Sequence, residues 1–222
     1  MEFVIGQISG LMDARFAAAA GTERVILNPW PSQGFSAHGT GDYEADYVHQ
    51  AEGQVEILKQ TLATWNEIKD WVAGPEIWLA VPSPCLSMAL EAYSSLEDCC
   101  GIMVPAGQPY ATRLPSQIPS QIPPQIPYAL DFSFTGLSRT RAWSSVHPPE
   151  WVVVPWSLLG TDSGSSEWAN KATYVLVESL EGVDALQTLQ ELPSIVGIYL
   201  QARPGDQTDY EAWQQIIDRI SL

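Results

Sequence analysis

The hydrophobic positions of the chain form short apolar runs that alternate with segments of helical spacing. Most of these runs are continuously apolar, as expected for strands that are covered on both faces. Strands that alternate with helical segments are typical of parallel strands joined by crossover helices. The predicted strands span residues 3–8, 24–28, 76–81, 101–105, 128–134, 151–156, 173–178 and 196–201. Eight parallel strands in one chain predict a closed (β/α)8 TIM barrel.

The connections between these strands differ in character. Helical spacing is clear over residues 13–20, 54–73, 86–96, 183–192 and 210–220. Residues 114–127 instead form a tandem Gln-Ile-Pro repeat, whose prolines forbid an ordinary helix. We expect a polyproline-II-like surface strap to replace one barrel helix there, the alternative being a ligand for a proline-recognition domain. Residues 28–53 form a long predicted loop on the catalytic face, which makes them a candidate lid.

Length and composition fit one folded unit. The 222 residues are 45% hydrophobic and 16% charged, which predicts a single globular domain over residues 1–222. The balance of 10 basic against 26 acidic residues gives a formal net charge of -16. This charge repels phosphate backbones and anionic lipid headgroups, so we expect neither nucleic acid nor a membrane surface as a partner. The chain pattern does not specify an oligomeric state.

Other sequence signals point to a cytoplasmic protein without a metal or cofactor. No window reaches the roughly 18 apolar residues of a membrane span, and no basic and apolar leader opens the chain. The three cysteines, Cys85, Cys99 and Cys100, are odd in number and fit a reducing compartment. The three histidines are scattered, and no pair of Cys-x-x-Cys motifs is present, so no zinc motif can be recognised.

Several segments resemble the phosphoribosylanthranilate isomerase family. Residues 4–21, with Val-Ile-Gly-Gln-Ile-Ser-Gly and a following Ala-rich stretch that ends in Gly, are similar to the family's first strand and helix. Residues 152–168 resemble its sixth strand, its Gly-Thr-Gly loop and the Phe-Asp-Trp that follows. Residues 174–180 and 197–210 occupy the places of strands seven and eight. The resemblance runs end to end and implies an isomerase-type barrel with its site at the strand C-termini.

The resemblance fails at the positions that carry the family's chemistry. It places Gly6 where the family has its general base, a Cys, and Pro155 where it has its general acid, an Asp. Neither side chain can carry a proton, so we expect ordinary Amadori isomerisation to be lost. Glu178-Ser179 and Gln201-Ala202 replace the small residues that bring backbone N–H groups to the substrate phosphate. The Glu178 carboxylate would repel a phosphate, and Arg203 is the obvious substitute for the Arg missing after strand two.

The strand ends still offer residues able to do chemistry. Asp131 and Glu178 are the acid–base candidates, because two carboxylates on different strands can be held at different pKa values. The simpler interpretation is that Asp131 caps a turn or pairs with Arg139 or Arg141, and that Glu178 pairs with Arg203. The candidate ligand-binding residues are Gln7, Asn28, Trp156, Ser179, Gln201 and Arg203.

The leading hypothesis is a diverged barrel that binds or converts an unidentified small molecule at the C-terminal face of its strands. One alternative is a functional isomerase in which Gln7 or Asp162 takes over proton transfer. The other is a non-catalytic scaffold that contacts a protein through the Gln-Ile-Pro strap or an acidic face. A polar pocket at the strand ends favours a small molecule, whereas strand ends filled by Trp30, Trp156 and Pro155 favour the scaffold.

Overall fold

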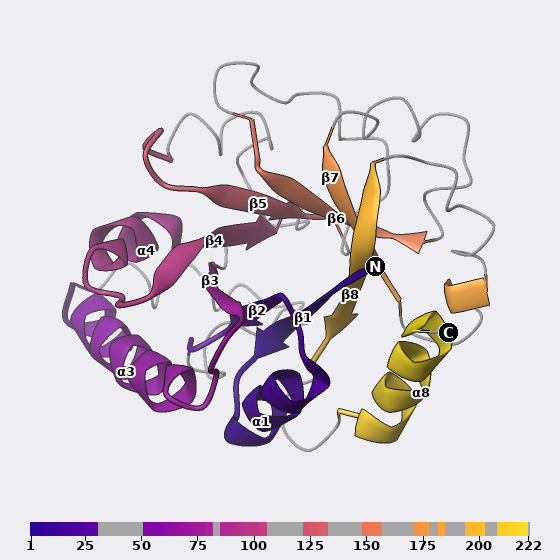
Figure 1. The fold of residues 1–222 in the computed structure, drawn as a ribbon. Coiled ribbons are helices and arrows are strands. Elements are labelled where there is room, and N and C mark those ends of the chain that lie inside the picture. Colours follow the sequence, from indigo (N-terminus) through magenta and orange to yellow (C-terminus); the bar gives the residue numbers. More distant parts are fainter. Residues whose placement is uncertain are drawn as a thin grey trace, which may run out of the picture.

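Eight parallel strands close into a barrel in chain order, and β8 pairs with β1 (Figure 1). The computed structural model describes residues 1–30, 51–81, 85–105, 122–132, 148–156, 171–177, 182–184, 194–202 and 208–221. The strands are β1 Glu2–Ile8, β2 Arg24–Leu27, β3 Glu76–Ala80, β4 Cys99–Pro105, β5 Tyr128–Asp131, β6 Trp151–Pro155, β7 Ala172–Leu176 and β8 Ile195–Gln201. The helices are α1 Leu11–Ala20, α3 Ala51–Lys69, α4 Leu86–Tyr93 and α8 Tyr210–Ser221. The predicted (β/α)8 barrel is confirmed.

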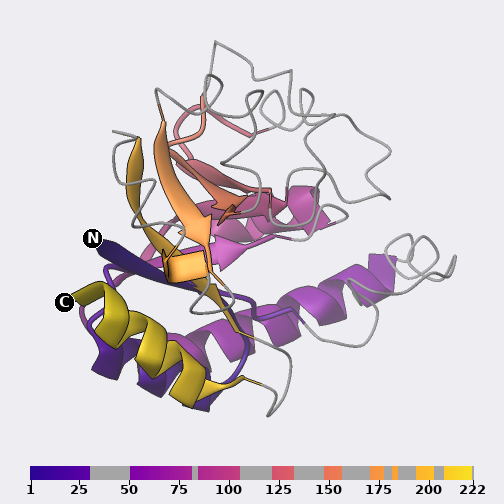
Figure 2. The same cartoon turned by 90° about the vertical axis from the view of Figure 1, so that its right-hand side faces the viewer.

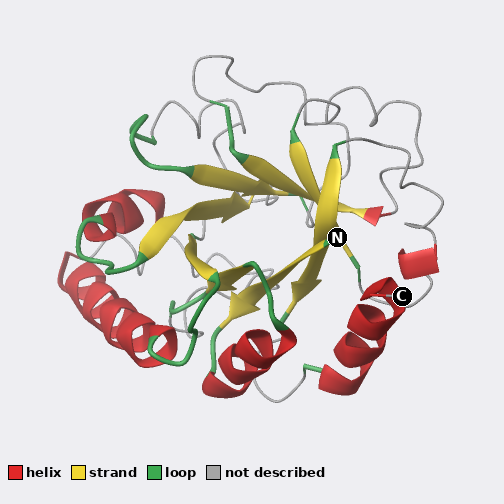
Figure 3. Cartoon of the chain, viewed as in Figure 1, coloured by secondary structure: helices red, strands yellow, loops and turns green. Residues whose placement is uncertain are grey.

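Helices lie outside the ring of strands, as Figure 3 shows. The first, α1, ends at Gly21, whose φ of 69° is the left-handed conformation that commonly stops a helix. The helix α3 ends at Lys69, earlier than its apolar spacing predicts. It ends there because the N–H groups of Trp71 and Val72 donate to the carbonyls of Ile68 and Lys69, three residues earlier, instead of four. It begins at Ala51, so the predicted loop over 28–53 is too long at its end.

Some connections fall partly outside the described residues. Of the predicted helix over 183–192, the structure describes the start, where residues 182–184 are helical. Residues 31–50, which contain most of the candidate lid, and residues 106–121 lie outside the described ranges. No helix among the described residues is long and apolar enough to cross a membrane.

Two apolar layers surround the strands. The outer layer lies between strands and helices and includes Trp65 and Ile68 of α3, both buried. The inner layer fills the barrel with large aromatic side chains. Among them, the Trp78 and Trp151 rings pack edge to face with their centroids 5.1 Å apart. The interior is therefore a packed core rather than a pore. The buried inner residues are Val4, Ile26, Trp78, Ala80, Met103, Ala129, Trp151, Val153, Tyr174, Leu176 and Tyr199.

The end of the Gln-Ile-Pro repeat takes part in the outer layer without forming a helix. Ile122 and Ile126 are buried in that layer, and the Ile126 N–H donates to the Pro123 carbonyl at 2.9 Å, which makes a turn. The Pro127 carbonyl accepts from the Ile102 N–H of β4 at 3.0 Å. Over residues 122–127, apolar strap side chains thus cover the barrel in place of a helix face.

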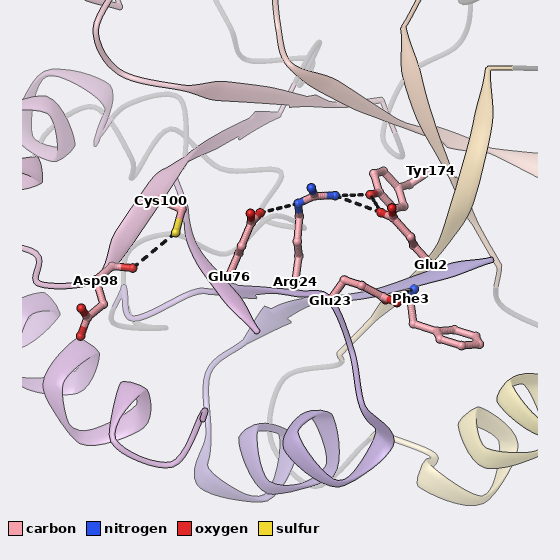
Figure 4. Close-up of polar contacts among 8 residues, drawn as sticks. All are labelled: Glu2, Phe3, Glu23, Arg24, Glu76, Asp98, Cys100 and Tyr174. Atoms are coloured by element: carbon pink, nitrogen blue, oxygen red, sulfur yellow. Dashed lines mark hydrogen bonds and ion pairs between the residues drawn. The ribbon is translucent and has the colours of Figure 1, made fainter. Parts of the chain in front are cut away.

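A polar network joins the N-terminal ends of four strands (Figure 4). Arg24 of β2 lies at its centre, with Nε 2.7 Å from Glu76 Oε2 and Nη1 3.2 Å from Glu2 Oε2. The Tyr174 hydroxyl, which comes from β7, contacts Arg24 and donates to Glu2. Because Tyr174 belongs to the inner layer, this network ties the aromatic core to the N-terminal rim.

The helices α1 and α8 come from opposite parts of the sequence and lie side by side (Figure 2). Phe16 of α1 packs against Tyr210 and Trp213 of α8, with ring centroids 5.3 and 5.5 Å apart. The Tyr210 hydroxyl donates to the buried Asp13 carboxylate at 2.8 Å. Burial raises the pKa of Asp13, and hydrogen bonds from Tyr210, Thr208 and Ser9 offset part of that rise.

We expect Arg24→Met to destabilise the protein by about 1–2 kcal/mol, because it removes the cation that lies between Glu2 and Glu76. The matched control is Arg219→Met, since Arg219 pairs with Asp184 at 3.2 Å on the surface with both side chains mostly exposed. That change should cost less than about 0.5 kcal/mol. Urea unfolding of both variants checks the prediction, and equal losses would contradict a special role for Arg24.

Asp13→Asn should stabilise the protein at neutral pH. The raised pKa means that the folded state favours the protonated carboxyl, so this contribution is complete below about pH 4 and is lost as the pH rises through the folded-state pKa. The advantage of the Asn variant should therefore grow between about pH 4 and pH 7. Urea midpoints measured across this range test the prediction. A difference that does not change with pH would show that titration of Asp13 plays no part.

Candidate functional site

The C-terminal ends of the strands bring five predicted residues to one end of the barrel. Because all eight strands are parallel, residues at strand ends far apart in sequence surround the same opening. The residues concerned are Gln7 of β1, Asn28 after β2, Asp131 of β5, Pro155 of β6 and Gln201 of β8. We call this end the mouth. All of them except Asp131 are partly exposed, so the mouth reaches solvent.

Gln7 and Asn28 form a joined pair at the mouth. The Asn28 Nδ2 group donates to Gln7 Oε1 at 2.9 Å, and the Asn28 backbone N–H donates to the Ile8 carbonyl at 2.6 Å. Gln7 has a φ of 61°, a left-handed conformation that is unfavourable for a residue with a side chain. Such strained positions concentrate at binding sites. Asn28 Oδ1 is buried and has no hydrogen-bond partner among the residues described.

Asp131 points into the barrel. Ala129, two residues earlier on β5, belongs to the inner layer, and alternate residues of a strand share a face. Asp131 is buried, with 1% of its surface exposed. Tyr199 lies in the same inner layer, and the Asp131 charge raises the pKa of its hydroxyl. A carboxylate thus lies beneath the mouth, where the sequence predicted an acid–base candidate.

Tyr199 of β8 is the residue that sequence reasoning missed. A β-carbon built on Gly6 would overlap the Tyr199 ring and hydroxyl, so this side chain fills the space that a residue at position 6 would occupy. Tyr199 is fully buried. Burial, and then the Asp131 charge, raise the pKa of its hydroxyl well above the usual value, while the Gln7 side chain lowers it. The group is therefore a hydrogen-bond donor rather than a base at neutral pH.

The buried Tyr199 hydroxyl lacks a hydrogen-bond partner among the described residues. Gln7 lies near enough to influence its pKa, yet no described residue completes a hydrogen bond of good geometry with it. One signal for Tyr199 was present in the sequence, because it precedes the predicted ligand-binding Gln201 by two residues and shares its strand face. Its position over Gly6 depends on the register of β8 against β1, which the sequence pattern does not specify.

The two predicted tryptophans do not fill the barrel. Trp30 is buried in the outer layer and donates its Nε1 hydrogen to the Ala80 carbonyl at 2.5 Å. Trp156 is half-buried against the same layer, and a β-carbon on Gly182 would come within 3.2 Å of its ring. Pro155 is half-buried at the mouth. Glu178, Ser179 and Arg203 lie outside the described residues.

The described part of the chain gathers no group of three or more His, Cys, Asp or Glu side chains suited to a metal ion. Among the described residues, the polar side chains considered at the mouth are the amides of Gln7, Asn28 and Gln201, the carboxylate of Asp131 and the hydroxyl of Tyr199. Such a set can donate and accept hydrogen bonds, and its one ionisable carboxylate gives it negative character.

Gly6→Ala should destabilise the protein by about 1–3 kcal/mol, because the added methyl group and the Tyr199 ring require the same space. In a Tyr199→Ala background the same change should cost much less, since the ring is gone. Urea unfolding of the two single variants and the double variant gives the coupling between the positions. Simple addition of the two penalties would contradict the proposed packing.

The fold is similar to those of solved phosphoribosylanthranilate isomerases. Mutually generated monomers of the Thermotoga maritima enzyme match with a TM-score of 0.55 and 14% identity, covering 100% of this chain and 98% of that one. An isomerase in complex with reduced 1-(o-carboxyphenylamino)-1-deoxyribulose 5-phosphate matches at 0.57 and 13%, with 100% and 98% covered. TrpF from Jonesia denitrificans matches at 0.58 and 11%, with 100% and 97% covered. No protein-family model and no curated protein matches the sequence. At these identities the likeness shows the fold: a barrel like that of the phosphoribosylanthranilate isomerases.

Proposed function

We propose that this chain is a diverged phosphoribosylanthranilate isomerase-like barrel that binds or converts a small molecule at its mouth and lacks the standard Amadori isomerisation. The observation that carries the proposal is the Tyr199 ring over Gly6. The resemblance assigns the general base to position 6, and there the chain has a hydrogen atom covered by a tyrosine ring. A ligand at the mouth meets a buried hydroxyl donor instead of a base.

The rest of the acid–base pair is also incomplete among the described residues. Pro155, at the place of the family's acid, has no ionisable group. The pKa of Tyr199 is raised, so its hydroxyl does not remove a proton at neutral pH. Asp131 can supply one of the two roles that ring opening and the following proton shift require. A single described carboxylate does not replace both an acid and a base.

The charge of the site disfavours the phosphosugar substrate of an ordinary isomerase. None of Gln7, Asn28, Asp131, Tyr199 and Gln201 is a cation, and Asp131 adds a buried carboxyl group. The formal net charge of -16 adds a long-range repulsion of anions. These features support an uncharged ligand better than a phosphorylated one.

Purified protein is expected to show no turnover of phosphoribosylanthranilate in a fluorescence assay, because the proton-transfer pair is missing. Asp131→Asn and Glu178→Ala variants, prepared in the same way, identify any activity that comes from a contaminating enzyme. The further control is Tyr93→Phe, whose hydroxyl bonds the Cys99 carbonyl at the start of β4, away from the mouth. Turnover that persists in Tyr93→Phe and disappears in Asp131→Asn or Glu178→Ala would overturn the proposal.

A further inference from the structure

Tyr199 Oη and Asn28 Oδ1 are buried polar atoms at the mouth that lack hydrogen-bond partners within the described residues, as do the indole N–H groups of Trp78 and Trp151 inside the barrel. Buried polar atoms in folded proteins almost always have a partner, since leaving one unsatisfied costs free energy. Tyr199 is fully buried. Tyr199 lies on β8 and Asn28 directly follows β2, so both unsatisfied atoms lie at the same end of the barrel. One ligand could therefore satisfy both of them.

Gln7 connects the two atoms. Its Oε1 accepts the Asn28 amide at 2.9 Å, and its side chain lies close enough to Tyr199 to lower the pKa of the hydroxyl. With this arrangement, Tyr199 retains an O–H hydrogen to donate, and Asn28 retains a carbonyl oxygen to accept. The left-handed φ of Gln7 shows that the backbone is held in a costly conformation at the point that joins them.

We propose that Tyr199, Gln7 and Asn28 form a recognition site for an uncharged group that both accepts and donates hydrogen bonds, such as a primary carboxamide. The carbonyl of this group accepts from Tyr199 Oη, and its NH2 donates to Asn28 Oδ1. This inference rests on the proposed function, since it names the ligand class for the same mouth. The proposal requires a ligand to enter past the partly exposed Gln7 and Asn28 side chains, because Tyr199 Oη and Asn28 Oδ1 are themselves buried.

Charged groups fit this site less well. A carboxylate has no hydrogen to donate to Asn28 Oδ1, and any anion, phosphate included, is repelled by the Asp131 charge that also acts on Tyr199. An ammonium group has no lone pair to accept from Tyr199 Oη. An uncharged carboxamide satisfies both open atoms with one planar group.

The test uses benzamide and benzoate, which differ in a carboxamide against a carboxylate on the same ring. Binding to the full chain is measured by titration of protein NMR signals. We expect benzamide to bind at least about tenfold more tightly than benzoate. Tyr199→Phe should weaken benzamide binding about fivefold or more, which is the value of one hydrogen bond. Asn28→Ala should weaken it as well.

Stability separates a ligand-binding hydroxyl from a structural one. Tyr199→Phe keeps the ring that covers Gly6 and removes the unsatisfied oxygen, so the melting temperature of the ligand-free protein should rise by about 2–4 °C. The control Tyr93→Phe removes a hydroxyl that does have a partner, the Cys99 carbonyl at 3.1 Å. It should lower the melting temperature and leave benzamide binding unchanged.

Three results would overturn the inference: no benzamide binding to the wild-type chain, equal affinity for benzoate, or unchanged affinity in Tyr199→Phe. Each leaves the proposed loss of isomerisation standing, because that is tested separately by phosphoribosylanthranilate turnover. Conversely, turnover in the wild-type chain would refute the proposed function even where benzamide binds as expected.

Discussion

The packing of aromatic rings against glycine backbone is the constraint on which the barrel depends. Trp78 faces Gly101 on the neighbouring strand, and a β-carbon there would come within 2.5 Å of the indole ring. Tyr174 faces Gly197, where a β-carbon would come within 2.9 Å of a Tyr174 ring carbon and 2.3 Å of the Glu2 carbonyl oxygen. An eight-stranded barrel has just enough interior volume for side chains to fill it. Large rings on some strands therefore require glycine beside them.

This constraint also explains where polar chemistry is located. Rings occupy the middle of the barrel, so the charged side chains described above lie towards its two ends. The N-terminal end carries the Arg24 network, whose partners are bonded to one another. The C-terminal end carries Gln7, Asn28 and Tyr199, where two polar atoms stay open in the described structure. One end is thus held by ion pairs, and the other is the end that we propose for binding, as is usual for this fold.

Much of the fold, but less of the site, could be predicted from the sequence. Continuously apolar runs located all eight strands, with ends that lie within three residues of those observed. Parallel topology then placed Gln7, Asn28 and Asp131 at one end. The inward or outward direction of a side chain depends on strand register, so the outward packing of Trp156 was not predictable. The contact of Arg24 with Tyr174 joins residues 150 positions apart, which no local pattern reveals.

The pairing of β1 with β8 sets an order on the folding of the chain during synthesis. Residues Glu2–Gly6 find their partners on β8 at Gly197–Gln201, close to the other end of the sequence. Until that strand leaves the ribosome, β1 keeps one edge unpaired, and Tyr199 has not yet covered Gly6. An unpaired, apolar edge invites association with other chains. The exposed edge of β1 therefore has to be shielded until β8 has been synthesised.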